Sequence, residues 1–282
     1  MRDFASKSLF EFNRLLGKFS YRGLTTDTSQ YSPIFVVGLP RSGTTFFYQS
    51  IIDQFELGYL HNHFRYLYGY PTIPKPYDQI KKPNSLESNH GYVKGWNSPS
   101  EHFGIWRGLF GEQVSAGSIA NISDLNPNEI IKTRNIIYSL QNLASGSYVF
   151  KCLYLDLCIS ALAKIFPQSR FIYLRRDFDA VRRSMFKARS MHATEDWWSV
   201  KVPGWKDMTR RSIDEQVDFQ LSSLSVILDE QISTLDEERV YNLHFEEFCS
   251  NVDLCVTALS GWLADIGVQR RHSAESLANK VR

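Results

Sequence analysis

The sequence lacks a strong excess of charge of either sign. Its 282 residues include 32 Lys and Arg against 30 Asp and Glu, which leaves a formal net charge of only +2. A strongly positive field supplies most of the non-specific affinity for nucleic acids, and this chain does not have one. We therefore do not expect a nucleic-acid-binding protein.

Cysteine is also scarce, with four residues at positions 152, 158, 249 and 255. The two members of each pair lie six positions apart, whereas structural zinc sites place paired cysteines about two to four positions apart. A chain of this length can bury a large core without disulfide bonds. We expect buried thiols in a reducing compartment and no metal ion.

Long hydrophobic runs are absent as well. The most apolar stretch, residues 153–166, is interrupted by Asp156 and Lys164, and a membrane span needs about 18 or more apolar residues. The first residues, MRDFASKSLFEFNRLLGKF, lack the apolar core and the small-residue cleavage site of a secretory signal. These features predict a cytoplasmic protein with no transmembrane segment.

The N-terminal residues do contain a helical pattern. Apolar residues recur at near-helical spacing from Phe4 to Phe19, with basic residues among them. This pattern predicts an amphipathic helix within a lead-in segment over residues 1–30. The helix would pack on the domain or on a second subunit of a homodimer, or it would lie on a membrane surface, and the sequence leaves these alternatives open.

From residue 31 onward, short β-branched and aromatic runs alternate with longer helical patterns, which is typical of a parallel sheet covered by helices. Residues 60–128 form an irregular insert rich in Tyr, Trp, Pro and Asn, and loops of this length are uncommon unless functional. No repeat or flexible linker divides the sequence, so we predict one α/β domain over residues 1–282, with a central parallel β-sheet flanked by helices. The expected strands lie near 34–37, 148–151, 171–174 and 240–243, and the expected helices over 44–55, 156–166, 177–189, 213–235 and 251–266.

The turn after the first expected strand has the spacing of a phosphate-binding loop. Gly38-Leu-Pro-Arg-Ser-Gly43 joins an apolar strand to a helix that begins at Thr44. Such a turn directs backbone N–H groups and the positive end of the helix at an anion, and the second glycine lets the backbone approach that anion closely. Thr44 and Thr45 would add hydroxyl donors.

This loop differs from that of a nucleoside triphosphatase. Thr44 stands at the position of the essential Lys, and the basic residue is Arg41 instead. A later strand, which would end on a metal-binding acid in those enzymes, ends here on Lys151. A sulfuryl group carries less charge than a phosphoryl group, and Lys, Arg and N–H donors can handle it alone. The residues therefore favour metal-independent sulfuryl transfer, with a P-loop nucleotide kinase as the alternative.

Two motifs resemble those of the sulfotransferases that use 3′-phosphoadenosine-5′-phosphosulfate (PAPS). Residues 40–45 resemble the 5′-phosphosulfate loop of that family. The family's 3′-phosphate motif has an Arg followed eight residues later by a Ser, and Arg176 and Ser184 occupy these positions, with Phe178 in place of the usual Pro. Apart from the resemblance, Ser184 lies about two helical turns beyond Arg176, so both side chains can reach one anion. The resemblance implies the following PAPS-binding residues: Arg41, Ser42, Gly43, Thr44, Thr45, Arg176 and Ser184.

Further matches point to the bacterial and tyrosylprotein-like branch of the family. Lys151 matches the family's strand-end Lys, residues 202–205 (VPGW) resemble a segment of bacterial members, and residues 245–248 (FEEF) resemble a late Tyr-Glu-Asp-Leu element. The resemblance covers about residues 33–267. It implies a P-loop-like sulfotransferase fold, PAPS as co-substrate with adenosine 3′,5′-bisphosphate as product, catalytic roles for Arg41 and Lys151, no metal, and an acceptor-side role for the insert.

Sulfuryl transfer to a hydroxyl also needs a base that accepts the hydroxyl proton. In the cytosolic branch the base is a His two residues after the strand-end Lys, but that position is Leu153 here. In the tyrosylprotein-like branch it is a Glu about twenty residues past the loop Arg, and the same distance leads here to His61 and His63. A histidine has an ordinary pKa near neutrality, so these two residues are the first candidates for the base.

The insert supplies the next candidates. Glu101 and His102 rank second as base or acceptor ligands, and His90 ranks third. We expect the acceptor to be a hydroxyl-bearing small molecule, sugar or lipid, and a nucleotide-binding module without catalysis is a further reading because the usual base is missing. Aromatic residues of the insert would stack on the acceptor or form a satellite core: Tyr66, Tyr68, Tyr70, Trp96 and Trp106.

Overall fold

The computed structural model describes residues 28–62, 64, 93–101, 103–192 and 196–271, together with residues 8, 11–13 and 15. The expected N-terminal helix therefore lies largely outside the described residues, as do His63, Tyr66, His90 and His102. Among the described residues, no helix is both long and apolar enough to cross a membrane.

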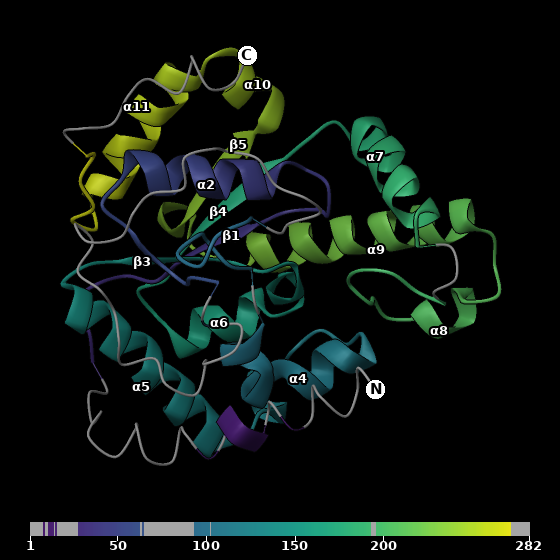
Figure 1. The fold of residues 1–282 in the computed structure, drawn as a ribbon, viewed down its shortest axis with the longest axis horizontal. Coiled ribbons are helices and arrows are strands. Elements are labelled where there is room, and N and C mark those ends of the chain that lie inside the picture. Colours follow the sequence, from purple (N-terminus) through teal and green to yellow (C-terminus); the bar gives the residue numbers. More distant parts are fainter. Residues whose placement is uncertain are drawn as a thin grey trace.

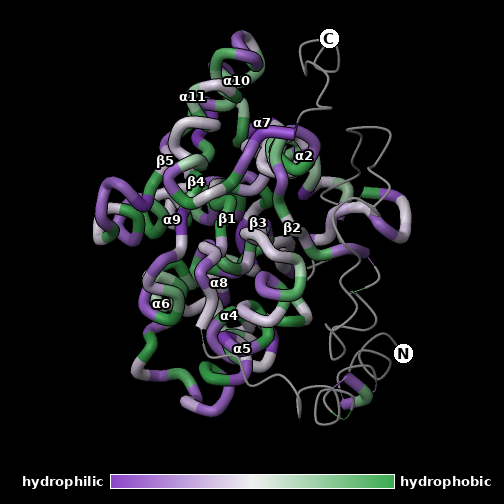
Figure 2. Tube along the Cα trace, turned by 90° about the vertical axis from the view of Figure 1, so that its left-hand side faces the viewer, coloured by the Kyte–Doolittle hydropathy of each residue, from purple (hydrophilic) through white to green (hydrophobic). Residues whose placement is uncertain are grey.

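A five-stranded sheet with the order β2-β3-β1-β4-β5 forms the centre of the fold, and each neighbouring pair is parallel. Figure 2 shows the strands side by side in this order. The α/β architecture that the sequence predicts is thus confirmed, with the four expected strands and a short fifth. The strands are β1 (Ile34–Val37), β2 (Gly58–Tyr59), β3 (Tyr148–Lys151), β4 (Arg170–Arg175) and β5 (Val240–His244).

Helices cover both faces of this sheet (Figure 1). On one face lie α2 (Thr44–Gln54), α10 (Phe245–Ser250) and α11 (Val252–Ala264). On the other lie α4 (Arg107–Ala116), α5 (Pro127–Ala144), α6 (Ile159–Ile165) and α9 (Ile213–Ser233). The remaining helices are α7 (Phe178–Ser190), which packs on α9, and α8 (Trp205–Met208), with single 3-10 turns at Gly104–Trp106, Ile122–Asp124, Leu153–Leu157 and Glu237–Arg239.

Strand β1 holds the two layers together because all four of its side chains are buried. Successive side chains of a strand point to opposite faces. Ile34 and Val36 accordingly join the core beneath α2, while Phe35 and Val37 join the core on the other face. The Phe35 ring stacks on Phe150 of β3 at a centroid distance of 5.5 Å and on a ring of β4 at 5.4 Å.

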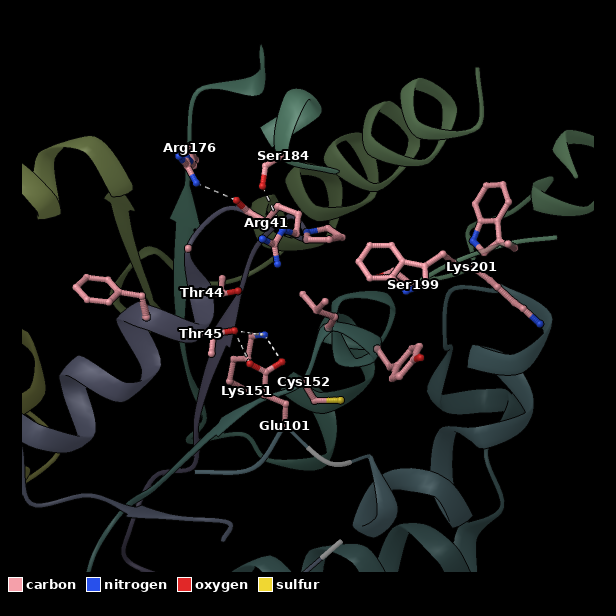
Figure 3. Close-up of a pocket in the computed structure, with 17 residues that line it drawn as sticks. Arg41, Thr44, Thr45, Glu101, Lys151, Cys152, Arg176, Ser184, Ser199 and Lys201 are labelled. Carbon is pink, nitrogen blue, oxygen red and sulfur yellow. Dashed lines mark hydrogen bonds and ion pairs between the residues drawn. The ribbon is translucent and has the colours of Figure 1, made fainter. Parts of the chain in front are cut away.

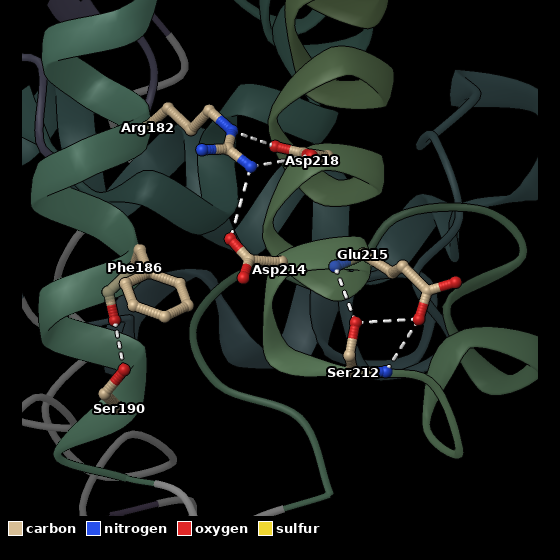
Figure 4. A network of polar contacts seen from close by, with 7 residues as sticks. All are labelled: Arg182, Phe186, Ser190, Ser212, Asp214, Glu215 and Asp218. Atoms are coloured by element: carbon tan, nitrogen blue, oxygen red, sulfur yellow. Dashed lines mark hydrogen bonds and ion pairs between the residues drawn. The ribbon is translucent and has the colours of Figure 1, made fainter.

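Helix α7, which carries Ser184, is fixed at its start and along its side. Asp177 caps it, as the sequence predicts, by accepting a hydrogen bond from the Ala180 N–H at 2.8 Å. Arg182 then forms ion pairs with Asp214 and Asp218 of α9 (Figure 4). Helix α9 begins with a capping box of its own between Ser212 and Glu215. The Arg182 ion pairs hold α7 against this helix.

Two expectations need correction. The helix expected over 156–166 begins only at Ile159, because residues 153–157 form a tight 3-10 turn after β3. The insert is also less irregular than its composition suggests, since α4 lies within it and its Trp106 is buried in the main core. Trp106 is therefore a core residue and not part of a stacking wall.

Candidate active site

A cavity of about 630 Å³ opens at the carboxyl ends of β1, β3 and β4 (Figure 3). This is the edge of a parallel sheet at which ligands usually bind. Its walls come from the loop after β1, the end of β3, the end of β4 with α7, and two distant segments around residues 101 and 197–201. The lining residues are Pro40, Arg41, Gly43, Thr44, Thr45, Phe46, Glu101, Lys151, Cys152, Leu153, Tyr154, Arg176, Ser184, Trp197, Trp198, Ser199 and Lys201.

The loop after β1 has the conformation of an anion-binding turn. Arg41 and Gly43 both adopt left-handed backbone angles, with φ of 70° and 91°. Gly43 is required on steric grounds too, because a Cβ atom there would lie 2.2 Å from the Phe245 ring. Thr44 and Thr45 open α2, whose first turn contains no acidic residue of its own. Because Gly43, Thr44 and Thr45 line the cavity, the positive end of this helix faces it.

Ser42 is the one member of the expected loop set that does not line the cavity. Its side chain is buried, and its hydroxyl oxygen has no hydrogen-bond partner among the described residues. Its backbone N–H donates to the Leu39 carbonyl at 3.1 Å. Ser42 thus shapes the turn in this structure and does not present its hydroxyl to the cavity.

The two motifs that are far apart in the sequence meet at Arg41. The Arg41 Nε donates to the Ser184 hydroxyl at 3.2 Å, and an Arg176 guanidinium nitrogen donates to the Arg41 carbonyl at 3.1 Å (Figure 3). The Arg176 guanidinium also lies over the Phe245 ring, 4.7 Å from its centroid. Burial, and secondarily the Arg176 charge, lower the pKa of Arg41, which still leaves a guanidinium charged at neutral pH.

A buried ion pair lies at the floor of the cavity. Lys151 ends β3, its side chain is 3% exposed, and its ammonium group contacts the Glu101 carboxylate, whose side chain is 16% exposed. The other oxygen of Glu101 accepts a hydrogen bond from the Thr45 hydroxyl at 2.5 Å, and Lys151 donates to the same hydroxyl oxygen at 3.3 Å (Figure 3). Basic, acidic and hydroxyl groups therefore meet beside the anion-binding turn.

Pairing between two loops delivers Glu101 to this place. The Ser100 N–H donates to the Leu60 carbonyl at 2.7 Å, and the Asn62 N–H donates to the Ser98 carbonyl at 2.9 Å. The segment that precedes Glu101 is thereby attached antiparallel to the chain just beyond β2. The following residue of the insert then points its carboxylate into the cavity.

His61, a first-ranked base candidate, is not among the residues that line the cavity. It is buried, its Nδ1 lies 3.1 Å from the Asn97 carbonyl oxygen, and its ring packs against Tyr59 at 4.6 Å between centroids. The reason is topological: β2 is an edge strand, and β3 with its terminal Lys151 lies between it and the anion-binding turn. Of the two base candidates that the structure describes, His61 and the second-ranked Glu101, it is Glu101 that lines the cavity.

The opposite wall consists of residues 197–201 and was not foreseen. Trp197, Trp198 and Ser199 line the cavity, and Ser199 has a left-handed φ of 69°. Two backbone carbonyls of the segment accept hydrogen bonds from the Gln220 amide of α9, at 3.0 Å and 2.5 Å. The wall is therefore firmly supported, and the Trp-Trp pair ahead of the VPGW segment was the sequence signal that could have revealed it.

Burial raises the pKa of two further groups close to Lys151, the Cys152 thiol and the Asp156 carboxyl. Cys152 lines the cavity, and burial raises the pKa of its thiol to about 12, so it remains a neutral thiol. Burial also raises the pKa of the Asp156 carboxyl well above its usual range, although the nearby Lys151 charge opposes this. Asp156 accepts a hydrogen bond at 3.4 Å from the Gly38 N–H at the start of the loop.

The remaining cysteines and the acidic residues do not suggest a metal site. Cys152, Cys158 and Cys255 are buried free thiols, as expected, while Cys249 is half-buried. Within the described ranges, no cluster of three or more His, Cys, Asp or Glu side chains could hold a metal ion.

The sulfotransferase family matches the chain over residues 33–264. Two solved structures have a similar fold: sulfotransferase STF9 from Mycobacterium avium, with a TM-score of 0.60, 16% identity and coverage of 90% of this chain and 67% of that one, and sulfotransferase STF1 from Mycobacterium tuberculosis H37Rv, with a TM-score of 0.59, 16% identity and coverage of 97% and 76%. No curated protein sequence matches the chain. The family match spans every strand of the sheet and all the elements that line the cavity.

Proposed function

The chain belongs to the sulfotransferase family, and we propose that it transfers a sulfuryl group from PAPS to a hydroxyl of a small-molecule, carbohydrate or lipid acceptor. The observation that carries the proposal is the Lys151–Glu101 ion pair beside the anion-binding turn. A base, a cation and a set of anion-binding donors are the three parts that sulfuryl transfer to a hydroxyl requires.

The donor would lie along the loop and the start of α7. The loop N–H groups, Thr44, Thr45 and Arg41 would hold the 5′-phosphosulfate, since they line one wall of the cavity. Arg176 and Ser184 would hold the 3′-phosphate, because both flank Arg41 on the side away from Lys151. This arrangement leaves the sulfuryl group between the loop and Lys151.

Transfer would then proceed by in-line displacement. The acceptor oxygen forms a bond to sulfur while the bond from sulfur to the 5′-phosphate oxygen breaks, and the hydroxyl proton passes to the Glu101 carboxylate. Lys151 and Arg41 stabilise the negative charge that develops on the leaving phosphate oxygen and on the sulfuryl oxygens. These cations can carry out that role without a metal ion, so we propose metal-independent transfer with adenosine 3′,5′-bisphosphate as the product.

The acceptor would enter against the opposite wall. Trp197 and Trp198 belong to that wall and Tyr154 also lines the cavity, and aromatic faces of this kind bind sugar rings and apolar bodies. Replacing Trp198 by Ala is expected to raise the KM for the acceptor more than the KM for PAPS. We further propose that the protein resides in the cytoplasm and that residues 1–30 contribute to a homodimer, which cell fractionation and size-exclusion chromatography with light scattering would test.

Turnover of radiolabelled PAPS with a panel of hydroxyl acceptors tests the proposal. We expect Glu101→Gln to lower turnover by about 10²- to 10⁴-fold, which is typical for loss of a general base, and His61→Ala to retain most of it. Glu112→Gln, an exposed glutamate of α4, is the matched control. Loss of turnover in His61→Ala with normal turnover in Glu101→Gln would reverse the assignment of the base. Binding of ATP with Mg²⁺ in preference to PAPS would favour a kinase-like activity.

A further inference from the structure

We propose that Glu101 also competes with the donor for its binding site, and that donor binding frees Glu101 to act as the base. The inference rests on the proposed function, because it assigns Lys151 and Thr45 to the sulfuryl group. It adds an order to the reaction, in which the base becomes available only after PAPS has bound.

Both carboxylate oxygens of Glu101 contact groups that belong to the proposed donor site. One oxygen contacts the Lys151 ammonium, and the other accepts the Thr45 hydroxyl hydrogen at 2.5 Å. Both carboxylate oxygens are therefore directed at groups of the donor site before any ligand binds. The carboxylate must turn away from these groups to reach an acceptor hydroxyl.

The Glu101 carboxylate also lies where the sulfuryl group of the donor would bind. Thr45 lies in the first turn of α2, which has no acidic residue of its own, and Glu101 comes from 56 residues further along the chain. A negative charge at a helix N-terminus is favourable. The Glu101 carboxylate thus meets the same helix end, hydroxyl and ammonium group that the sulfuryl oxygens would need.

The charged side chains that line the cavity favour this competition. Arg41, Lys151, Arg176 and Lys201 line the cavity, and among the lining residues that the structure describes Glu101 is the single carboxylate. An ion pair as buried as that between Lys151 and Glu101 is screened little by solvent. The Thr45 hydroxyl has a single hydrogen, which it donates to Glu101, so the sulfuryl group can take that hydrogen only by displacing the carboxylate. The displaced carboxylate then turns toward the acceptor hydroxyl.

Isothermal titration calorimetry of PAPS without an acceptor tests this competition. Removing a side chain that binds the donor weakens affinity, whereas removing a competitor strengthens it. Glu101→Gln keeps the shape of the side chain and removes its charge, and we expect it to bind PAPS about 10-fold more tightly, since a charge-assisted hydrogen bond to a competitor is lost. Adenosine 3′,5′-bisphosphate, which lacks the sulfuryl group, should gain less. Glu112→Gln should bind both ligands like the wild-type protein.

Turnover measured on the same variants separates this inference from the proposed function. Tighter PAPS binding with lost turnover supports both, and tighter binding with retained turnover supports the competition but removes Glu101 as the base. Unchanged or weaker PAPS binding by Glu101→Gln overturns the competition even if turnover is lost. Failure of the wild-type protein to bind PAPS overturns both. Thermal denaturation of each variant, with Glu101→Ala as a second substitution, checks that an altered affinity does not come from misfolding.

Discussion

Replacement of Arg176 by Ala is a direct test of the 3′-phosphate site. The Arg176 side chain is 28% exposed and lies at the end of β4, where it donates to the Arg41 carbonyl and stacks on Phe245. Its Nε has no close hydrogen-bond partner, and the nearest carboxylate oxygen, on Glu246, lies 3.8 Å away. The guanidinium is therefore held in position and retains donors for an anion.

The expected effect follows from one charge-assisted contact. Such a contact contributes about 1.5 to 3 kcal/mol, which corresponds to roughly 10- to 150-fold in affinity. Arg176→Ala should weaken the binding of adenosine 3′,5′-bisphosphate by that factor. The affinity for adenosine 5′-phosphate should change little, because this ligand has no 3′-phosphate and so makes no such contact with Arg176.

Calorimetric titration of the wild-type protein and of Arg176→Ala gives the dissociation constants of both nucleotides. The ratio of the two constants should rise in Arg176→Ala if this side chain binds the 3′-phosphate. Arg175→Ala is the matched control, since Arg175 is the neighbouring residue but pairs with Asp229 at 2.8 Å and does not line the cavity. Equal losses for both nucleotides in Arg176→Ala would refute the assignment. They would mean that Arg176 acts only by supporting the loop through the Arg41 carbonyl.

Three other substitutions or modifications probe the parts that support the site. Gly43→Ala would place a Cβ 2.2 Å from the Phe245 ring at a left-handed φ, so we expect about 1 to 3 kcal/mol of lost stability and weaker donor binding; unchanged thermal melting and donor affinity would contradict this geometry. Ser212→Ala removes the capping box of α9 and should lower the free energy of unfolding by about 1 kcal/mol in a denaturant titration, with donor affinity unchanged. The Cys152 thiol, whose pKa is raised to about 12, should resist alkylation at pH 8, while the half-buried Cys249 reacts first; peptide mapping by mass spectrometry would detect the opposite order.

The sequence was sufficient to predict the parts of the fold that local signals determine. The apolar strand, the glycine-bounded turn and the helix from Thr44 follow one another without a gap, and each has its own residue signature. Asp177 marks the start of α7 for the same reason, since its carboxylate caps a backbone N–H only three residues away. Because the alternation of strand and helix patterns implies a parallel sheet, the sequence also placed Arg41, Lys151 and Arg176 at one edge of it.

Segments whose structure depends on distant packing were harder to predict. Helix α4 has three buried side chains along ten residues, so its apolar periodicity is weak, and it forms because Phe110 and its neighbours pack into the main core. The expected helix started at Asp156, but residues 153–157 form a 3-10 turn, because the chain turns sharply after β3. Neither helix α4 nor the 3-10 turn after β3 has a local sequence signal that is strong enough to predict it.

The choice of base shows why spacing in a sequence could not decide the chemistry. Counting about twenty residues past the loop Arg leads to His61 and His63. His61 lies just beyond β2, and β3 with Lys151 lies between it and the turn, while His63 lies outside the described residues. Among the described residues, the carboxylate that reaches the turn comes instead from a segment paired with the chain beyond β2, through backbone hydrogen bonds at Leu60 and Asn62 and side-chain hydrogen bonds from Asn62. Such pairing depends on the length and path of the whole insert, which no short motif encodes. A carboxylate delivered on a loop can also move more easily than one fixed on a strand, and this mobility is what exchange between the Lys151 pair and an acceptor hydroxyl would require.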